Sequence, residues 1–172
     1  MKQLLVIDTN ILSHALTPNQ TAAYASLFAQ LEQTYRFVVT GYTQYELLCS
    51  SDIIHIEKIH RYVAENMVYV ELSQILMDFA AKLRYLYSKE IPDRTKGISH
   101  CDTINAALCL AKECPLLTID NTDYPRPFFV DQNRYRLKYI SKQKREVTDT
   151  VYMLTPDCEN ALILAQKHGV KV

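Results

Sequence analysis

The sequence predicts an α/β fold in which a central, mainly parallel sheet is flanked by helices. Short apolar runs of strand length alternate with longer segments whose apolar residues recur every three or four positions, as in amphipathic helices. Two of the apolar runs, residues 4–7 and 115–119, end at an aspartate, Asp8 and Asp120. Ligands of open parallel sheets bind at the carboxyl ends of the strands, so we expect the functional site at that edge.

The remaining elements follow from the same patterns. Strands are also expected at residues 37–39, 68–70, 135–140 and 147–154. Helices are expected at residues 11–16, 21–35, 42–50, 53–66, 73–88, 99–112 and, starting with Pro156 at its first position, 156–168. Residues 92–97 are polar and are expected to form a mobile loop.

Composition limits the classes of function. The 172 residues are enough for one domain with a sizeable core, and 48% of them are hydrophobic. There are 19 Lys and Arg against 19 Asp and Glu, so the formal net charge is zero. A strongly basic nucleic-acid-binding protein is therefore not indicated, and contact with nucleic acid would need a local basic patch or a metal among the acids.

We expect a cytoplasmic protein. Only four apolar residues precede Asp8, too few for a signal peptide, and no apolar run approaches the length of a membrane span. The five cysteines form no CxxC pair and are odd in number, which is typical of free thiols in a reducing compartment.

The acids that follow the two strands also have simpler explanations. Asp8 or Asn10 would serve equally as the N-cap of the next helix. Asp120 or Asp123 would equally form an Asx-turn. These interpretations and a functional role do not exclude one another.

Two further acids lie in predicted helices. Asp102 stands three residues after Ser99, the spacing of a capping box. Glu46 could be an ordinary solvated glutamate, but Tyr45 and Leu47 flank it and favour burial, where a carboxylate needs a partner.

Convergence of these acids would require a cation. If the crossovers are right-handed, both strand ends face one edge of the sheet. Two like charges ~4 Å apart repel by about 4 kcal/mol at an effective dielectric near 20, so four ionised acids need protons or a divalent ion. An all-oxygen site favours Mg²⁺ or Mn²⁺, whose usual use is to activate water against a phosphodiester.

Four segments, residues 6–12, 45–48, 102–107 and 117–124, resemble in order and spacing the motifs of PIN-domain nucleases, in particular the toxins of VapBC toxin–antitoxin pairs. The resemblance implies a three-layer α/β fold with an acidic pocket that holds Mg²⁺ or Mn²⁺. It also implies cleavage of single-stranded RNA that leaves a 5′-phosphate and a 3′-hydroxyl. Residues 1–125 would be the nuclease core, and 126–172 a C-terminal hairpin–helix extension of the same domain.

The resemblance also assigns roles. Asp8 and Asp102 would hold the metal, and Glu46 would orient or deprotonate the attacking water. Asp120, Asp123 or both would complete the set and hold a second metal or a metal-bound water. The residues expected to support these acids are Thr9, Asn10 and Thr118.

Several alternatives stay open. The expected partners are single-stranded RNA, an antitoxin protein and a second copy of the chain, with no membrane. The rival functions are a catalytically silent PIN-like binding or scaffold module and a structure-specific DNA nuclease. Phosphate contacts could come from two basic clusters, for which a solvated face is the simpler interpretation: Arg84, Lys89, Arg94 and Lys96, and Arg134, Arg136 and Lys138.

The segment after residue 125 is expected to be an interaction surface rather than part of the catalytic machinery. A lone hairpin is marginally stable, and this one carries more apolar surface than it can bury. One face could be covered by the last helix through Ala161, Leu162 and Ala165. The other would be left for a partner, with apolar residues from the set Tyr135, Tyr139, Val151, Tyr152 and Leu154.

Overall fold

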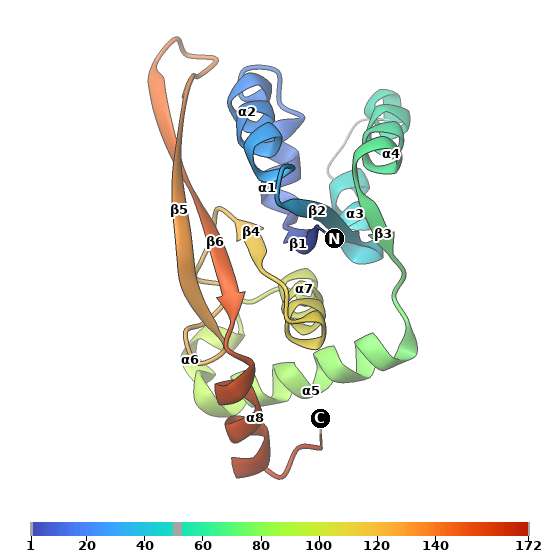
Figure 1. Ribbon diagram of the computed structural model, residues 1–172, viewed down its shortest axis with the longest axis vertical. Helices are drawn as coiled ribbons and strands as arrows, with labels where there is room; N and C mark the ends of the chain where they lie inside the picture. Colours follow the sequence, from blue (N-terminus) through green and yellow to red (C-terminus); the bar gives the residue numbers. More distant parts are fainter. Residues whose placement is uncertain (1, 50–52, 172) are drawn as a thin grey trace.

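The computed structural model describes residues 2–49 and 53–171, which form a six-stranded sheet with helices on both faces (Figure 1). The strand order is β3-β2-β1-β4-β6-β5. The first four strands in this order are parallel, and β6 runs antiparallel to both β4 and β5. The strands are β1 (Gln3–Ile7), β2 (Tyr35–Thr40), β3 (Val68–Val70), β4 (Leu116–Thr118), β5 (Phe129–Ile140) and β6 (Glu146–Pro156).

The helices make the outer layers. They are α1 (Thr9–Ala15), α2 (Thr21–Leu31), α3 (Gly41–Cys49), α4 (Ile53–Asn66), α5 (Gln74–Glu90), α6 (Pro92–Thr95), α7 (His100–Lys112) and α8 (Cys158–Lys167). The predicted α/β class with a central, mainly parallel sheet flanked by helices is confirmed. None of the helices in the described part of the chain is long and apolar enough to cross a membrane.

Side chains point alternately to the two faces of the sheet, so there is one hydrophobic core on each face. In β1, Val6 faces the core made with α5, α7 and α8, whereas Leu5 and Ile7 face the core made with α1, α2 and α4. Because both faces are covered, the central strands are apolar without a polar break. The sheet edge at the carboxyl ends of β1 and β4 therefore lies between the two helix layers.

The chain after residue 125 is built into this sheet. Residues of β6 pair with β4 through Leu116 and Leu154, and through Thr118 and Tyr152. Val151 and Met153 are buried in one core and Leu154 in the other. The division at residue 125 stays a prediction, but β6 contributes to both cores of the described structure.

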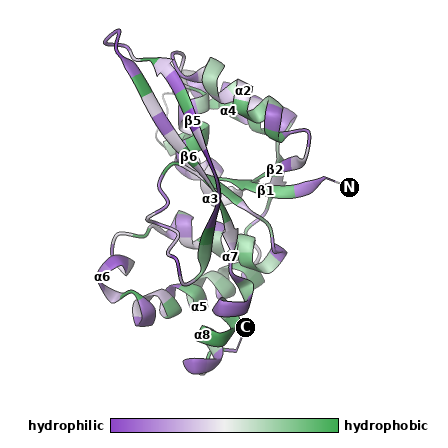
Figure 2. Ribbon diagram, turned by 60° about the vertical axis from the view of Figure 1, so that its left-hand side comes forward, coloured by the Kyte–Doolittle hydropathy of each residue, from purple (hydrophilic) through white to green (hydrophobic). Residues whose placement is uncertain are grey.

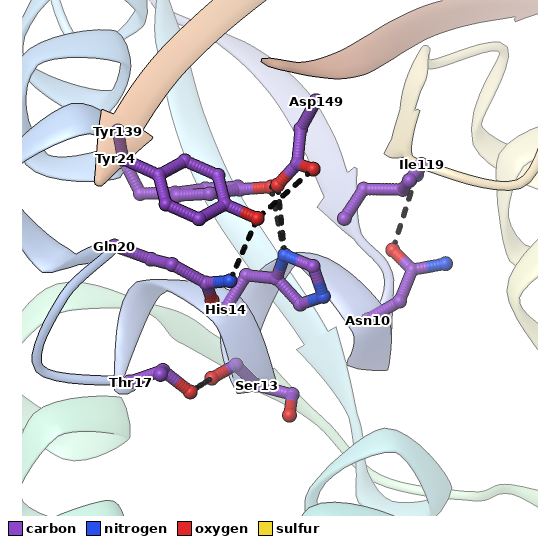
Figure 3. A network of polar contacts seen from close by, with 9 residues as sticks. All are labelled: Asn10, Ser13, His14, Thr17, Gln20, Tyr24, Ile119, Tyr139 and Asp149. Atoms are coloured by element: carbon purple, nitrogen blue, oxygen red, sulfur yellow. Dashed lines mark hydrogen bonds and ion pairs between the residues drawn. The ribbon is translucent and has the colours of Figure 1, made fainter. Parts of the chain in front are cut away.

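A polar network fixes one face of the β5–β6 hairpin against α1 and α2 (Figure 3). Asp149 accepts hydrogen bonds from Tyr24 Oη at 2.9 Å and Tyr139 Oη at 3.2 Å, and its Oδ2 lies 3.0 Å from His14 Nδ1. Gln20 Nε2 donates to Tyr139 Oη at 2.9 Å. The expectation that this face is open to a partner is therefore wrong, because α1 and α2 already cover it.

Several elements differ from the sequence prediction. The helix predicted over residues 21–35 ends at Leu31, and Tyr35 begins β2 because it pairs with Gln3 of the first strand. Residues 92–97 are not simply a loop: they include α6, from which Arg94 Nη2 donates to the carbonyl of Thr122 at 2.6 Å. Ser50, the predicted end of one helix, lies outside the described residues.

The last helix also differs. Pro156 ends β6 instead of opening α8, and Asp157 caps the helix by accepting from the Asn160 amide at 3.0 Å. Ala165 is buried as predicted, but Leu162 is 50% exposed and does not face the core.

Candidate metal and nucleic-acid site

The site is built around Asp8, which follows β1 and is the N-cap of α1. Its carboxylate is buried and accepts from the Thr9 amide at 2.7 Å, Asn10 Nδ2 at 2.9 Å and Thr118 Oγ1 at 2.7 Å. Burial, and then the charge of Asp102, raise the pKa of Asp8 to about 7, against the opposing effect of the hydrogen bonds. Asp8 is thus both the cap that the sequence allows and a strongly perturbed acid.

Glu46 of α3 lies beside this group. Its Oε2 accepts a hydrogen bond from Thr9 Oγ1 at 2.6 Å, so Thr9 links α1 to α3. The charge of Glu46 helps to raise the pKa of both Asp8 and Asp102. The predicted burial of its surroundings is only partly right, because Tyr45 is 61% exposed and Glu46 itself is half-buried.

Asp102 lies in the first turn of α7 and completes a capping box with Ser99. The Asp102 amide donates to Ser99 Oγ at 3.1 Å, and the Ser99 amide donates to Asp102 Oδ2 at 2.9 Å. Burial raises the pKa of Asp102, with a smaller contribution from the charge of Glu46, and the hydrogen bonds from Ser99 oppose this rise. The cap therefore fixes the orientation of a carboxylate that remains electrostatically coupled to the other acids.

The two acids after β4 differ in their surroundings. Asp120 is exposed and makes the predicted Asx-turn, accepting from the Thr122 amide at 2.9 Å. Asp123 is half-buried, and burial followed by the charges of Asp102 and Asp120 raises its pKa to about 6, partly offset by Arg94. Asp123 is thus coupled to Asp102, whereas Asp120 shapes the loop.

The structure also contains a cluster of buried polar side chains that was not expected from the sequence. Asn105 is fully buried in α7, and its Oδ1 accepts from Thr40 Oγ1 at 3.1 Å and Thr43 Oγ1 at 3.0 Å. Cys101 lies between this group and the acids, with its Sγ 3.5 Å from Thr9 Oγ1. The signal in the sequence was a lone asparagine within the otherwise largely apolar residues 104–110.

The chemistry of the donor set suits a hard cation. All charged groups that raise the pKa of Asp8 and Asp102 are carboxylates, and hard divalent ions prefer carboxylate oxygens. Among residues 2–49 and 53–171, however, no three His, Cys, Asp or Glu side chains stand close enough to form a ready-made metal cluster. The acids influence one another's pKa values, but their carboxylates would have to move closer together to bind an ion.

Comparison with known proteins supports the fold. No family model matches the sequence, and no curated protein matches it. Among solved structures, the chain is similar to one in the crystal structure of VapBC2 from Rickettsia felis bound to a DNA fragment from their promoter, with a TM-score of 0.56. The two are 16% identical, and the match covers 70% of this chain and 90% of that one. The likeness is one of fold.

Proposed function

We propose that this chain is a Mg²⁺- or Mn²⁺-dependent endoribonuclease that cleaves single-stranded RNA. The observation that carries the proposal is Asp8, a buried carboxylate at the carboxyl end of a parallel strand whose pKa is raised by burial and by Asp102. Strongly perturbed acids of this kind are typical of functional sites. A bound cation would offset the repulsion and favour the ionised form.

Each acid has a proposed role. Asp8 and Asp102 would hold the ion, which when bound supplies a Lewis acid for the phosphoryl oxygen and a more acidic water. Glu46, held by Thr9, would orient that water or take its proton. Asp123 is the better-placed fourth acid, because Asp120 is occupied by its turn. Cleavage would leave a 5′-phosphate on one product and a 3′-hydroxyl on the other.

We further propose that the chain acts as the toxin of a toxin–antitoxin pair. The fold likeness to a chain of the VapBC2 assembly supports a protein partner of the antitoxin kind. A second copy of this chain remains a predicted partner.

One observation favours a rival function. Because no ready-made cluster of three ligands is present among the described residues, a binding module without turnover is the second candidate. The two functions differ in Mn²⁺ binding, so metal titration separates them before any substrate is known.

The test combines calorimetric titration of Mn²⁺ with cleavage of a labelled single-stranded RNA and a DNA of matching sequence. Asp8→Asn and Asp102→Asn should each reduce cleavage by at least about a hundredfold, because the amide lacks the charge that holds the ion. Asp78→Asn, at an exposed aspartate of α5, is the matched control and should behave as wild type.

The outcomes are distinct. Wild-type protein that binds no Mn²⁺ and cleaves neither strand would support the binding module. Cleavage of the DNA at a similar rate would contradict the RNA specificity. An Asp8→Asn protein that cleaves like wild type would show that the site is misassigned.

A further inference from the structure

Positive charge is concentrated in one part of this neutral chain. Residues 134–145 contain no Asp or Glu. Their six basic residues are Arg134, Arg136, Lys138, Lys142, Lys144 and Arg145. The segment covers most of β5 and the turn at the free end of the hairpin, where Figure 2 shows mainly hydrophilic residues.

Strand register places three of these six charges on one face. Alternate residues of β5 share a face, and each lies opposite its partner in β6, so this face pairs Arg134 with Tyr152 and Arg136 with Thr150. Lys138 lies opposite Thr148 on the same face. We call these three basic residues of β5, together with the three residues of β6 opposite them, the basic strand face: Arg134, Arg136, Lys138, Thr148, Thr150 and Tyr152.

The basic strand face is continuous with the acidic site. Tyr152 is paired with Thr118 across the β4–β6 ladder, so their side chains lie on the same side of the sheet. Thr118 Oγ1 donates to Asp8 at 2.7 Å. The Arg134 guanidinium lies over the Tyr152 ring, 5.4 Å from its centroid. From the buried Asp8 and Thr118 outward, this side of the sheet thus carries the half-buried ring of Tyr152 and then the exposed cations.

Tyr152 packs against the core beneath α7, and the rest of this face points away from α1 and α2. The network around Asp149 and Tyr139 occupies the opposite face, against α1 and α2 (Figure 3). The side chains of Arg134 and Lys138 are 58% and 69% exposed. Their partners, Asp131 and Glu146, form exposed ion pairs of the kind that contribute little to stability.

The other basic side chains of this segment are exposed and available to bind phosphates. Arg136 and three residues of the hairpin turn are exposed and form no ion pair with any described residue: Lys142, Lys144 and Arg145. Residues two apart on a strand stand about 7 Å apart, so successive nucleotides of an extended strand can meet successive side chains.

We propose that the basic strand face, with the hairpin turn, is the track that carries single-stranded RNA to the acids, an inference that rests on the proposed nuclease function. Lys and Arg would neutralise phosphates, and Tyr152 would stack on a base beside the acidic site. A protein partner fits less well, because Ile140, next to the basic strand face and opposite Glu146, is the single large apolar side chain on this side of the hairpin that is strongly exposed among the described residues.

The first test measures binding of a labelled 20-nucleotide polyuridine RNA by fluorescence anisotropy in EDTA. The triple variant Arg136→Gln, Lys142→Gln, Lys144→Gln should bind at least about tenfold more weakly than wild type. Loss of three phosphate contacts should also reduce the slope of log K against log salt by about 2.

The matched control removes the same charge elsewhere. Lys58→Gln, Arg61→Gln and Lys82→Gln alter exposed residues of α4 and α5, away from the hairpin (Figure 1). This variant should keep the wild-type affinity and slope. Equal losses of RNA affinity in both triple variants would mean that net charge alone governs binding, and would refute the proposed RNA track.

A second pair of variants tests the stacking residue. Tyr152→Leu should weaken RNA binding about tenfold, whereas Tyr152→Phe should retain it, because the ring rather than the hydroxyl stacks on a base. Thermal melting of both variants checks that they fold. If Tyr152→Leu folds and binds as well as wild type, the ring is not part of the track.

The same measurements separate this proposal from the nuclease proposal. Wild-type protein that binds RNA through the hairpin but does not cleave it in Mn²⁺ would refute catalysis and retain the track. Protein that cleaves RNA, but whose affinity and salt slope are unchanged in the hairpin triple variant, would refute the track and retain catalysis.

Discussion

At the scale of single residues, Asp8 combines a structural role with an energetic cost. Its carboxylate caps α1 and accepts from Thr118, yet it is buried beside other acids. Ionisation of Asp8 therefore destabilises the folded chain, and a cation or a proton relieves that cost. A residue that stabilised the fold alone would not need to be an acid in this position.

This predicts a pH dependence of stability without divalent ions. The pKa of Asp8 rises from 3.8 in the unfolded chain to about 7 when folded, and that of Asp123 to about 6. Between pH 4 and 7 the folded state therefore binds more protons, and stability falls as pH rises. In EDTA the melting temperature should drop by roughly 5 °C between pH 5 and 8.

Two comparisons check the cause of this drop. Millimolar Mn²⁺ should raise the melting temperature most at pH 8, because the proposed site would bind it through the ionised acids of the folded state. Asp8→Asn should flatten the profile, and Asp78→Asn should leave it unchanged. A melting temperature that climbs from pH 5 to 8 in EDTA would contradict the raised pKa values.

At the scale of elements, the first turn of α7 decides where Asp102 points. The capping box with Ser99 holds one carboxylate oxygen of Asp102, and the other lies 3.4 Å from Tyr124 Oη. A cap that is only structural also exists in this chain: Ser73 accepts from the Leu76 amide of α5 at 3.2 Å. Comparison of Ser99 with Ser73 therefore separates the stabilisation of a helix by its cap from the positioning of Asp102.

Ser99→Ala and Ser73→Ala should each lower stability by about 1 kcal/mol, since each removes one N-cap acceptor. The expected fall in melting temperature is about 2–4 °C for both. Only Ser99→Ala should also weaken Mn²⁺ binding, measured by calorimetry, because only its turn positions an acid of the proposed metal site. Equal Mn²⁺ affinity in the two variants would show that the cap does not set the site.

At the scale of the whole molecule, the β5–β6 hairpin joins the two cores to the candidate RNA track. Val151 and Met153 fill the core beneath α1 and α2, and Leu154 fills the core beneath α7. Each such side chain contributes about 1.5–3 kcal/mol on burial, against a total stability of about 5–15 kcal/mol for a typical domain. The inner half of the hairpin therefore belongs to both cores, whereas its outer half is attached by the hydrogen bonds of Tyr139 and Asp149 to residues of α1 and α2 and the turn between them.

Deletion of residues 126–172 should abolish cooperative melting, because it exposes the edge of β4 and removes apolar groups from both cores. Replacement of residues 139–147 by Asn-Gly should retain a cooperative transition, because the pairing of Lys138 with Thr148 and all pairs closer to the sheet remain. The measurement is circular dichroism during heating. A truncated chain that melts cooperatively would show that residues 1–125 fold by themselves.

Interactions between residues close together in the chain made much of this fold predictable from the sequence. Apolar runs that end at Asp8 and Asp120, and the spacing of Ser99 and Asp102, predicted the α/β class, the strand ends and the cap, because strand alternation and capping depend on neighbours in the chain. The end of α2 was beyond that reasoning, since Tyr35 joins β2 through pairing with a strand far back in the chain.

Only the tertiary structure decided which acids influence one another's pKa and which face of the hairpin is free. Asp123 rather than Asp120 is coupled to Asp102, although both follow the same strand. Likewise β6 pairs with β4, which places Tyr152 beside Thr118 and turns the basic residues of β5 outward. Register and long-range contact depend on side chains far apart in the sequence, and a shift of one residue would exchange the two faces.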